Sequence, residues 1–108
     1  MTKARTSNNA PRAVWHRAEQ ANGSVRHILY INGSQTPFFV DDDRKAGMGH
    51  QTMGYPVSLH GAGMGKEVQC RDGSSYRIAA FLAGFRGVGP AKAKAEQMAF
   101  GALDKVAA

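Results

Sequence analysis

Residues Val25–Val40 read VRHILYINGSQTPFFV, and this stretch decides the fold. Val25–Asn32 is rich in apolar and β-favouring residues, Gly33-Ser34 supplies a turn, and Thr36–Val40 is a second apolar run. Two such runs on either side of a turn predict a β-hairpin. Proline cannot donate a hydrogen bond to a neighbouring strand, so Pro37 predicts that the second strand lies at a sheet edge or begins there.

The chain that follows this hairpin carries a glycine-rich segment, residues 41–66, with six of the 13 glycines. It shows no sustained period of either a strand or a helix, so we expect a long mobile loop with a short strand at Tyr55–Leu59. Beyond it, Lys66–Cys70 and Tyr76–Phe85 predict two strands around a turn at Asp72-Gly73-Ser74. The alanines of the second run leave a helix open as the alternative.

The two ends of the chain differ in pattern. Residues 1–11 are polar and basic and predict a flexible tail. Ala13–Gln20 is compatible with a short helix that ends at Asn22-Gly23, or with an irregular lead-in to the hairpin. After Pro90 the sequence predicts an amphipathic helix, whose apolar face consists of Ala95, Met98, Ala99, Ala102, Leu103 and Val106.

These elements together predict an α+β fold. We expect one small domain over residues 12–108, with an antiparallel sheet of about four strands and the C-terminal helix packed on one face. The chain of 108 residues and 11.6 kDa is long enough for one domain and too short for two.

Composition excludes several classes of protein. The single cysteine, Cys70, cannot form an internal disulfide, which favours a reducing compartment. The N-terminus lacks the apolar run of a signal peptide, and no stretch approaches the roughly 20 apolar residues of a membrane span. We therefore expect a cytoplasmic protein without a membrane partner. The net charge of +6 favours an anionic partner such as nucleic acid.

The segment Arg86–Lys94, RGVGPAKAK, is the strongest candidate for an anion site. Pro90 suits the first turn of a helix, and Gly87 and Gly89 permit close approach of the backbone to a neighbour. The first amides of that helix lack intrahelical acceptors and form the positive end of the helix dipole. Together with the cations Arg86, Lys92 and Lys94, they predict a phosphate site.

Three resemblances accompany this segment. Gly87–Phe100, GVGPAKAKAEQMAF, resembles the end of a double-stranded RNA-binding domain, in which a lysine-rich helix start grips phosphates; the resemblance implies that role for Lys92. Gly87-Val88-Gly89-Pro90 with Ala93 is also similar to the hairpin of a helix-hairpin-helix DNA-binding motif, which implies a helix before Gly87. From Tyr55 onward, the expected sheet and helix resemble DNA-binding domains of the AP2 or integrase type.

We therefore predict a nucleic-acid-binding protein that contacts the phosphate backbone, with RNA slightly favoured over DNA. The cations fall into two groups, five in residues 1–30 and seven in residues 66–108, which must converge to form one footprint. Beyond the segment 86–94, auxiliary contacts are expected from Arg12, Arg17, Arg26, Arg71 and Arg77.

Chemistry of other kinds finds little support in the sequence. The four histidines and Cys70 lie at long, irregular spacings that do not fit a zinc site, so we expect no metal and no cofactor. His60–Glu67 fails the phosphate-binding loop pattern, because His60 stands where the first glycine is required and Glu67 where Ser or Thr is required. Ser58, His60 and Asp72 contain the residue types of a catalytic triad without its spacing signature, and we expect no enzymatic activity.

A different class of function remains open, a non-enzymatic regulator or inhibitor that binds another protein, of the kind that phage and plasmid accessory genes encode. Its basis is the glycine-rich segment 41–66, where flexible methionines adapt to a partner surface. The residues expected to bind that partner are Met48, Met53, Tyr55, Leu59 and Met64. Self-association as a homodimer is a further expectation, because edge strands and a small core favour it.

Overall fold

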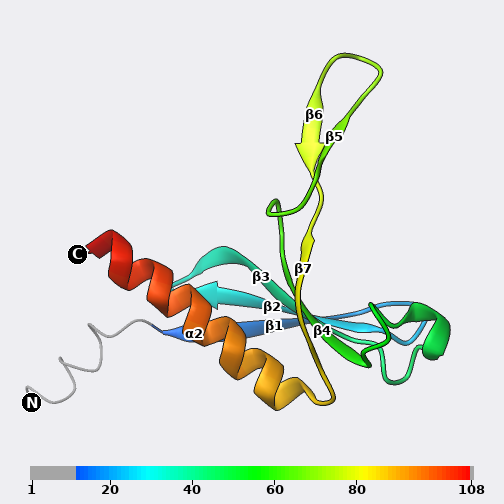
Figure 1. The fold of residues 1–108 in the computed structure, drawn as a ribbon. Helices are drawn as coiled ribbons and strands as arrows, with labels where there is room; N and C mark the ends of the chain where they lie inside the picture. The colour runs from blue at the N-terminus through cyan, green and yellow to red at the C-terminus, as the bar shows by residue number, and fades with distance from the viewer. Residues whose placement is uncertain (1–11, 108) are drawn as a thin grey trace, which may run out of the picture.

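The computed structural model describes residues 12–107, with side chains to Gly101; the tail predicted for residues 1–11 and the side chains of Ala102, Leu103 and Val106 lie outside that description. One five-stranded antiparallel sheet, in the order β1-β2-β3-β4-β7, forms the body, and helix α2 (Val88–Ala107) lies across one of its faces (Figure 1). The strands are β1 (Ala13–Glu19), β2 (Val25–Ile31), β3 (Ser34–Asp42), β4 (Val57–Gly61) and β7 (Ala80–Phe85). The α+β class and the helix on one face are confirmed, with five strands in the main sheet.

Strand β1 occupies the segment that the sequence analysis assigned to a short helix or an irregular lead-in, and this assignment is wrong. Seven residues of β1 pair with β2, from Ala13 opposite Ile31 to Glu19 opposite Val25. Asn22-Gly23 therefore belongs to a hairpin connection and does not end a helix. The ladder with β2 supplies backbone partners that an isolated segment could find only within a helix, so pairing overrides the weak local preference.

The hairpin of β2 and β3 is confirmed, and its turn is built by Asn32 and Gly33. Both have positive φ, 52° and 83°, as a two-residue turn between antiparallel strands requires. Strand β3 lies in the middle of the sheet, so the expected edge position of Pro37 is wrong. Pro37 is tolerated there because the register between β2 and β3 shifts at this point, and Thr36 Oγ1 donates instead to the carbonyl oxygen of Leu29 at 2.8 Å.

The glycine-rich segment 41–66 is not one continuous loop. It contains the end of β3, a 3₁₀ turn at Met48–His50 and the whole of β4, which lies between β3 and β7. Val57 and Leu59 of β4 are fully buried. The expected short strand at Tyr55–Leu59 is thus a central strand, shifted by two residues toward Gly61. The sequence shows no clear strand period here because β4 is only five residues long, which is too short to establish an alternation of apolar and polar residues.

Strands β5 (Glu67–Gln69) and β6 (Ser75–Arg77) form a separate two-stranded hairpin. Figure 1 shows this arm extending away from the sheet and from α2. The second strand expected over Tyr76–Phe85 is therefore interrupted, and its two parts belong to different sheets. All residues from Arg71 to Ala79 are exposed, so the arm adds nothing to the core.

The core lies between α2 and the sheet face that it covers. Ala95 and Ala99 of α2 are buried there and Met98 packs against the cluster, which confirms part of the predicted helix face; Ala91 is buried as well. They meet the apolar side chains of the three middle strands, Leu29, Ile31, Phe38, Val40, Val57 and Leu59. The small alanines bring the helix axis close to the sheet. No helix within residues 12–107 is long and apolar enough to cross a membrane.

Candidate functional site

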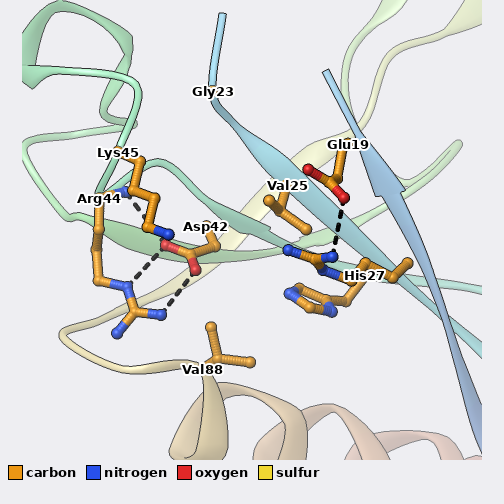
Figure 2. Close-up of a pocket in the computed structure, with 9 residues that line it drawn as sticks. Glu19, Gly23, Val25, His27, Asp42, Arg44, Lys45 and Val88 are labelled. Atoms are coloured by element: carbon orange, nitrogen blue, oxygen red, sulfur yellow. Dashed lines mark hydrogen bonds and ion pairs between the residues drawn. The ribbon is translucent and has the colours of Figure 1, made fainter. Parts of the chain in front are cut away.

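An open pocket of about 460 Å³ lies where the end of the sheet meets the start of α2. Its walls come from three places in the sequence: the β1–β2 hairpin, the end of β3 with the turn that follows, and the first residue of α2. The lining residues are Arg17, Glu19, Gly23, Val25, His27, Asp42, Arg44, Lys45 and Val88. Figure 2 shows Asp42, Arg44 and His27 around the space next to Val88. The pocket is thus assembled only in the folded chain.

Two arginines of the pocket are held by neighbouring carboxylates. Arg44 donates from Nε and Nη2 to the two oxygens of Asp42, at 2.8 and 2.7 Å, and Arg17 Nη1 donates to Glu19 at 2.9 Å. The hydrogen bonds from Arg44 are the main reason why the pKa of Asp42 is lowered. At least half of each guanidinium side chain is exposed, and such pairs are worth only about 0–1 kcal/mol. An incoming anion can therefore compete for both arginines.

Three cations, Arg17, Arg44 and Lys45, line the pocket beside the carboxylates of Glu19 and Asp42. His27 lies among them. Its pKa is lowered first by burial and next by the charge of Lys92, with Arg17 and Arg44 acting in the same direction. Asp42 opposes them and does not reverse the shift. Lys45 forms no hydrogen bond or ion pair with any described residue. The lowered pKa favours the neutral imidazole of His27.

Lys92 reaches the neighbourhood of this pocket from the first turns of α2. Its Nζ lies 5.3 Å from the centre of the Trp15 ring, and the Trp15 Nε1 donates to Glu96 at 2.8 Å. Trp15 thereby fixes strand β1 against the helix. Arg17 follows two residues later on the same face of β1, so it is carried toward the same end of α2 as Lys92.

The other predicted residues of the segment Arg86–Lys94 surround the helix start without lining the pocket. Helix α2 begins at Val88, and Pro90 lies in its first turn as expected. Arg86 is exposed, and Lys94 Nζ is 3.4 Å from Gln97 Oε1 on the exposed side of the helix. A Cβ at Gly89 would meet nothing within 4 Å, and one at Gly87 only Pro90 at 3.8 Å. The glycines are therefore not required for a close approach here.

The auxiliary cations are scattered. Arg12 lies at the opposite end of β1 from the pocket, where its backbone amide donates to Asn32. Arg26 stands on the sheet face away from α2, paired with Asp41. Arg71 and Arg77 belong to the arm. Of the five auxiliary residues, the structure brings only Arg17 to the pocket.

The residues predicted to bind a protein partner differ in their exposure to solvent. Met48 and Met53 are 84% and 74% exposed, and Tyr55 and Met64 are about half exposed. Leu59 is fully buried beneath α2 as part of β4, so its expected place on a docking surface is wrong. Four of the five therefore remain on the surface of the segment 41–66.

Sequence reasoning missed Arg44, Lys45 and His27. The run Asp41–Lys45 reads as slightly acidic in sequence, and only the strand pairing separates its parts: Asp41 and Asp42 point to opposite faces of β3. His27 could have been placed beside Arg17 from an antiparallel hairpin centred on Asn22-Gly23, since these two residues are directly opposed. The sequence would therefore have placed His27 beside Arg17 if Ala13–Glu19 had been predicted as a strand.

Comparisons with protein-family models, with curated proteins and with solved structures gave no match. Strand β7 precedes Gly87, where the helix-hairpin-helix resemblance implies a helix. In the described part of the chain, no group of three His, Cys, Asp or Glu side chains is placed to hold a metal ion. The candidate site is therefore defined by its own geometry, an anion-compatible pocket at the start of α2.

Proposed function

We propose that this protein binds nucleic acid through the phosphate backbone, with RNA slightly favoured over DNA. The observation that carries the proposal is the pocket at the start of α2, which collects Arg17, Arg44 and Lys45 from distant parts of the chain and lies near Lys92. Cations and free helix amides are the groups that contact phosphate oxygens in such complexes. The pocket lies on the open end of the sheet, where a long polyanion has access.

The preference for RNA rests on the resemblance of Gly87–Phe100 to the end of a double-stranded RNA-binding domain. Lys92, the residue to which that resemblance assigns phosphate contact, is also the cation of this segment that lies near the pocket. The charge of +6 supports either nucleic acid. Binding to RNA and to DNA of the same sequence is therefore to be compared directly.

Titration of the full chain with fluorescently labelled RNA and DNA tests the proposal. Trp15 is the only tryptophan and lies against Lys92, so its fluorescence should change when phosphate binds. The double variant Arg17→Ala, Lys92→Ala should lose about tenfold in affinity, because each charged contact contributes about 0.5–1 kcal/mol or more.

The matched control is the double variant Lys66→Ala, Arg71→Ala, which removes the same charge from the arm and from the residue that precedes it. It should bind like the unaltered protein. An equal loss in both double variants would show that general charge, and not the pocket, holds the ligand. Absence of salt-sensitive binding to either nucleic acid would refute the proposed function.

A second candidate function, a protein-binding regulator, is favoured by the exposure of Met48 and Met53. These methionine side chains are 84% and 74% exposed, and their flexibility lets them adapt to an apolar partner surface. Deleting the segment 46–66 would remove the buried strand β4, so the suitable variant is Met48→Ser, Met53→Ser. It should abolish recovery of a partner in a pull-down while leaving nucleic-acid binding unchanged; a partner retained by this variant would argue against the regulator.

A further inference from the structure

The sheet face opposite α2 carries a continuous cross-strand row of mostly aromatic residues. Directly opposed residues on this face run from β1 to β7 in the order His16, Ile28, Phe39, His60 and Phe81. At about 4.8 Å per strand, the row is about 19 Å long. No described helix covers it. His16 at the β1 end of the row is exposed, whereas Phe39 and His60 in its middle are buried.

The rings in this row are stacked on each other or on their neighbours. Phe39 and His60 are nearly parallel at 5.0 Å between centres, and His60 meets Phe81 edge to face at 6.0 Å. At the β1 edge, His16 stacks on Tyr30 at 4.0 Å. His16 is exposed at this edge, and Tyr30 is half-buried beside it.

A cation is built into the middle of the row. The guanidinium of Arg26 lies 4.1 Å above the Phe39 ring and is held there by two hydrogen bonds to Asp41, at 2.8 and 3.0 Å. His60 shares a hydrogen bond of 2.7 Å with Ser58, and burial lowers its pKa, which favours the neutral ring. The stack is thus fixed before any ligand arrives.

Tyr55 closes the row at the β7 edge. Its ring lies directly on the backbone of Gly84, so closely that a Cβ at Gly84 would collide with it. The ring stacks toward Phe81 at 6.1 Å and is still 44% exposed. Glycine at this position lets the ring lie against the strand with an outer surface facing solvent. This arrangement is a flat aromatic platform.

We propose that this face binds the unpaired bases of single-stranded nucleic acid, which stack on Tyr55 at one end of the row and on the His16–Tyr30 pair at the other. The proposal rests on the proposed function and specifies its substrate class. Bases stack on exposed aromatic rings with little regard to sequence, and nearby cations hold the phosphates between them. Arg26, stacked on Phe39, supplies a cation on this face.

A single strand fits this surface better than a duplex. A duplex keeps its bases stacked on each other and presents phosphates, so an aromatic row has no base faces to contact. A second copy of this chain is the competing occupant. The mixture of Arg26, Asp41 and two histidines on this face favours a polar, planar ligand over a purely apolar sheet.

Fluorescence anisotropy with labelled strands of about 16 nucleotides tests the inference. The probes are oligoadenylate and oligouridylate, their deoxy counterparts, and the duplexes formed from the same strands. The full chain should bind the single strands about tenfold more tightly than the duplexes at equal salt. Tyr55→Ala should lower single-strand affinity about tenfold, and Tyr55→Phe, which keeps the ring, should restore it.

Two further variants show whether a loss of binding follows from the missing ring or from unfolding. His16→Ala removes an exposed ring at the other end of the row and should weaken binding by several fold. Tyr76→Ala removes an exposed ring from the arm and should have no effect.

The outcomes separate the two proposals. Equal affinity for duplex and single strand, or unchanged binding by Tyr55→Ala and His16→Ala while Arg17→Ala, Lys92→Ala binds weakly, overturns this inference and leaves the proposed function standing. No binding to any probe refutes both. Sedimentation that shows a dimer dissociated by Tyr55→Ala identifies a second copy as the occupant and also overturns the inference.

Discussion

The two faces of the main sheet reach similar burial by different means. On the helix face, Val40 and Leu59 are fully buried beneath the alanines of α2. On the opposite face, Phe39 and His60 are each only 8% exposed although no described helix covers them. The guanidinium of Arg26 lies over Phe39, and His60 lies between the rings of Phe39 and Phe81. One face is sealed by a secondary-structure element and the other by single residues.

We expect the helix face to contribute most of the stability and the opposite face to be available for binding. The helix face buries aliphatic side chains in a closed layer, which is where a small domain gains most of its free energy of unfolding. The opposite face leaves ring surfaces at its margins, where a ligand can reach them, and holds a stacked cation in its middle. Substitutions on the two faces should therefore have different consequences, which the following predictions use.

The largest effect is expected from Leu59→Ala on the helix face. Removing a fully buried leucine side chain leaves a cavity between β4 and α2 and should lower the free energy of unfolding by about 3 kcal/mol. Urea unfolding followed by circular dichroism measures it. A change below about 1 kcal/mol would mean that α2 does not seal this face as described.

An intermediate effect is expected from Arg26→Ala on the opposite face. The change uncovers the Phe39 ring and leaves Asp41 without its two hydrogen bonds, at a cost of about 1–2 kcal/mol. Arg17→Ala, which breaks an exposed ion pair, is the control and should stay within about 0.5 kcal/mol of the unaltered protein. An equal loss of unfolding free energy in the two variants would show that Arg26 stabilises the protein no more than an exposed ion pair does.

A smaller effect is expected from pH, with one histidine on each face. Burial lowers the pKa of both His27 and His60 from the ordinary value of 6.5. The unfolded chain therefore binds protons more readily than the folded one, so stability is fully present above pH 6.5 and is lost as the pH falls through that value.

Urea midpoints between about pH 5.5 and 7.5 measure this dependence. The variant His60→Gln, which can keep the hydrogen bond to Ser58, should flatten the curve more than His27→Gln, because His60 is the more buried of the two. Stability that rises on acidification in this range would contradict the assignment.

The smallest effect on stability is expected from the arm. Ile78 N donates to Lys66 O at 3.1 Å, so a short glycine-containing turn can join these residues in place of Glu67–Arg77. The shortened protein should unfold within about 0.5 kcal/mol of the full chain, because the arm lies outside the core. A larger loss would show that the arm supports the sheet.

The fold was predictable where the pattern is local. Val25–Val40 forms the expected hairpin, and the alanine spacing after Pro90 gives the expected helix. Strand β1 was missed because Ala13–Gln20 lacks enough alternation to exclude a helix, and only its ladder with β2 decides the matter. The central place of β4 was missed because strand order depends on long-range pairing, which a five-residue strand does not encode locally.

The candidate site was predictable only in part. Arg17 and Lys92 were named from charge and from the helix start, and the fold brings both toward one end of α2. Arg44 and Lys45 were not predicted because they follow three aspartates, which give the run a net negative charge in the sequence. The aromatic row escaped notice entirely, since it exists only through the register of five strands.

The salt dependence of nucleic-acid binding tests the central claim most directly. Each phosphate contact contributes about one unit to the slope of log affinity against log salt concentration. The variant Arg17→Ala, Lys92→Ala should lower that slope by about 2, whereas the control Lys66→Ala, Arg71→Ala should leave it unchanged. An unchanged slope in the first variant, or an equal decrease in both, would contradict a phosphate site at the start of α2.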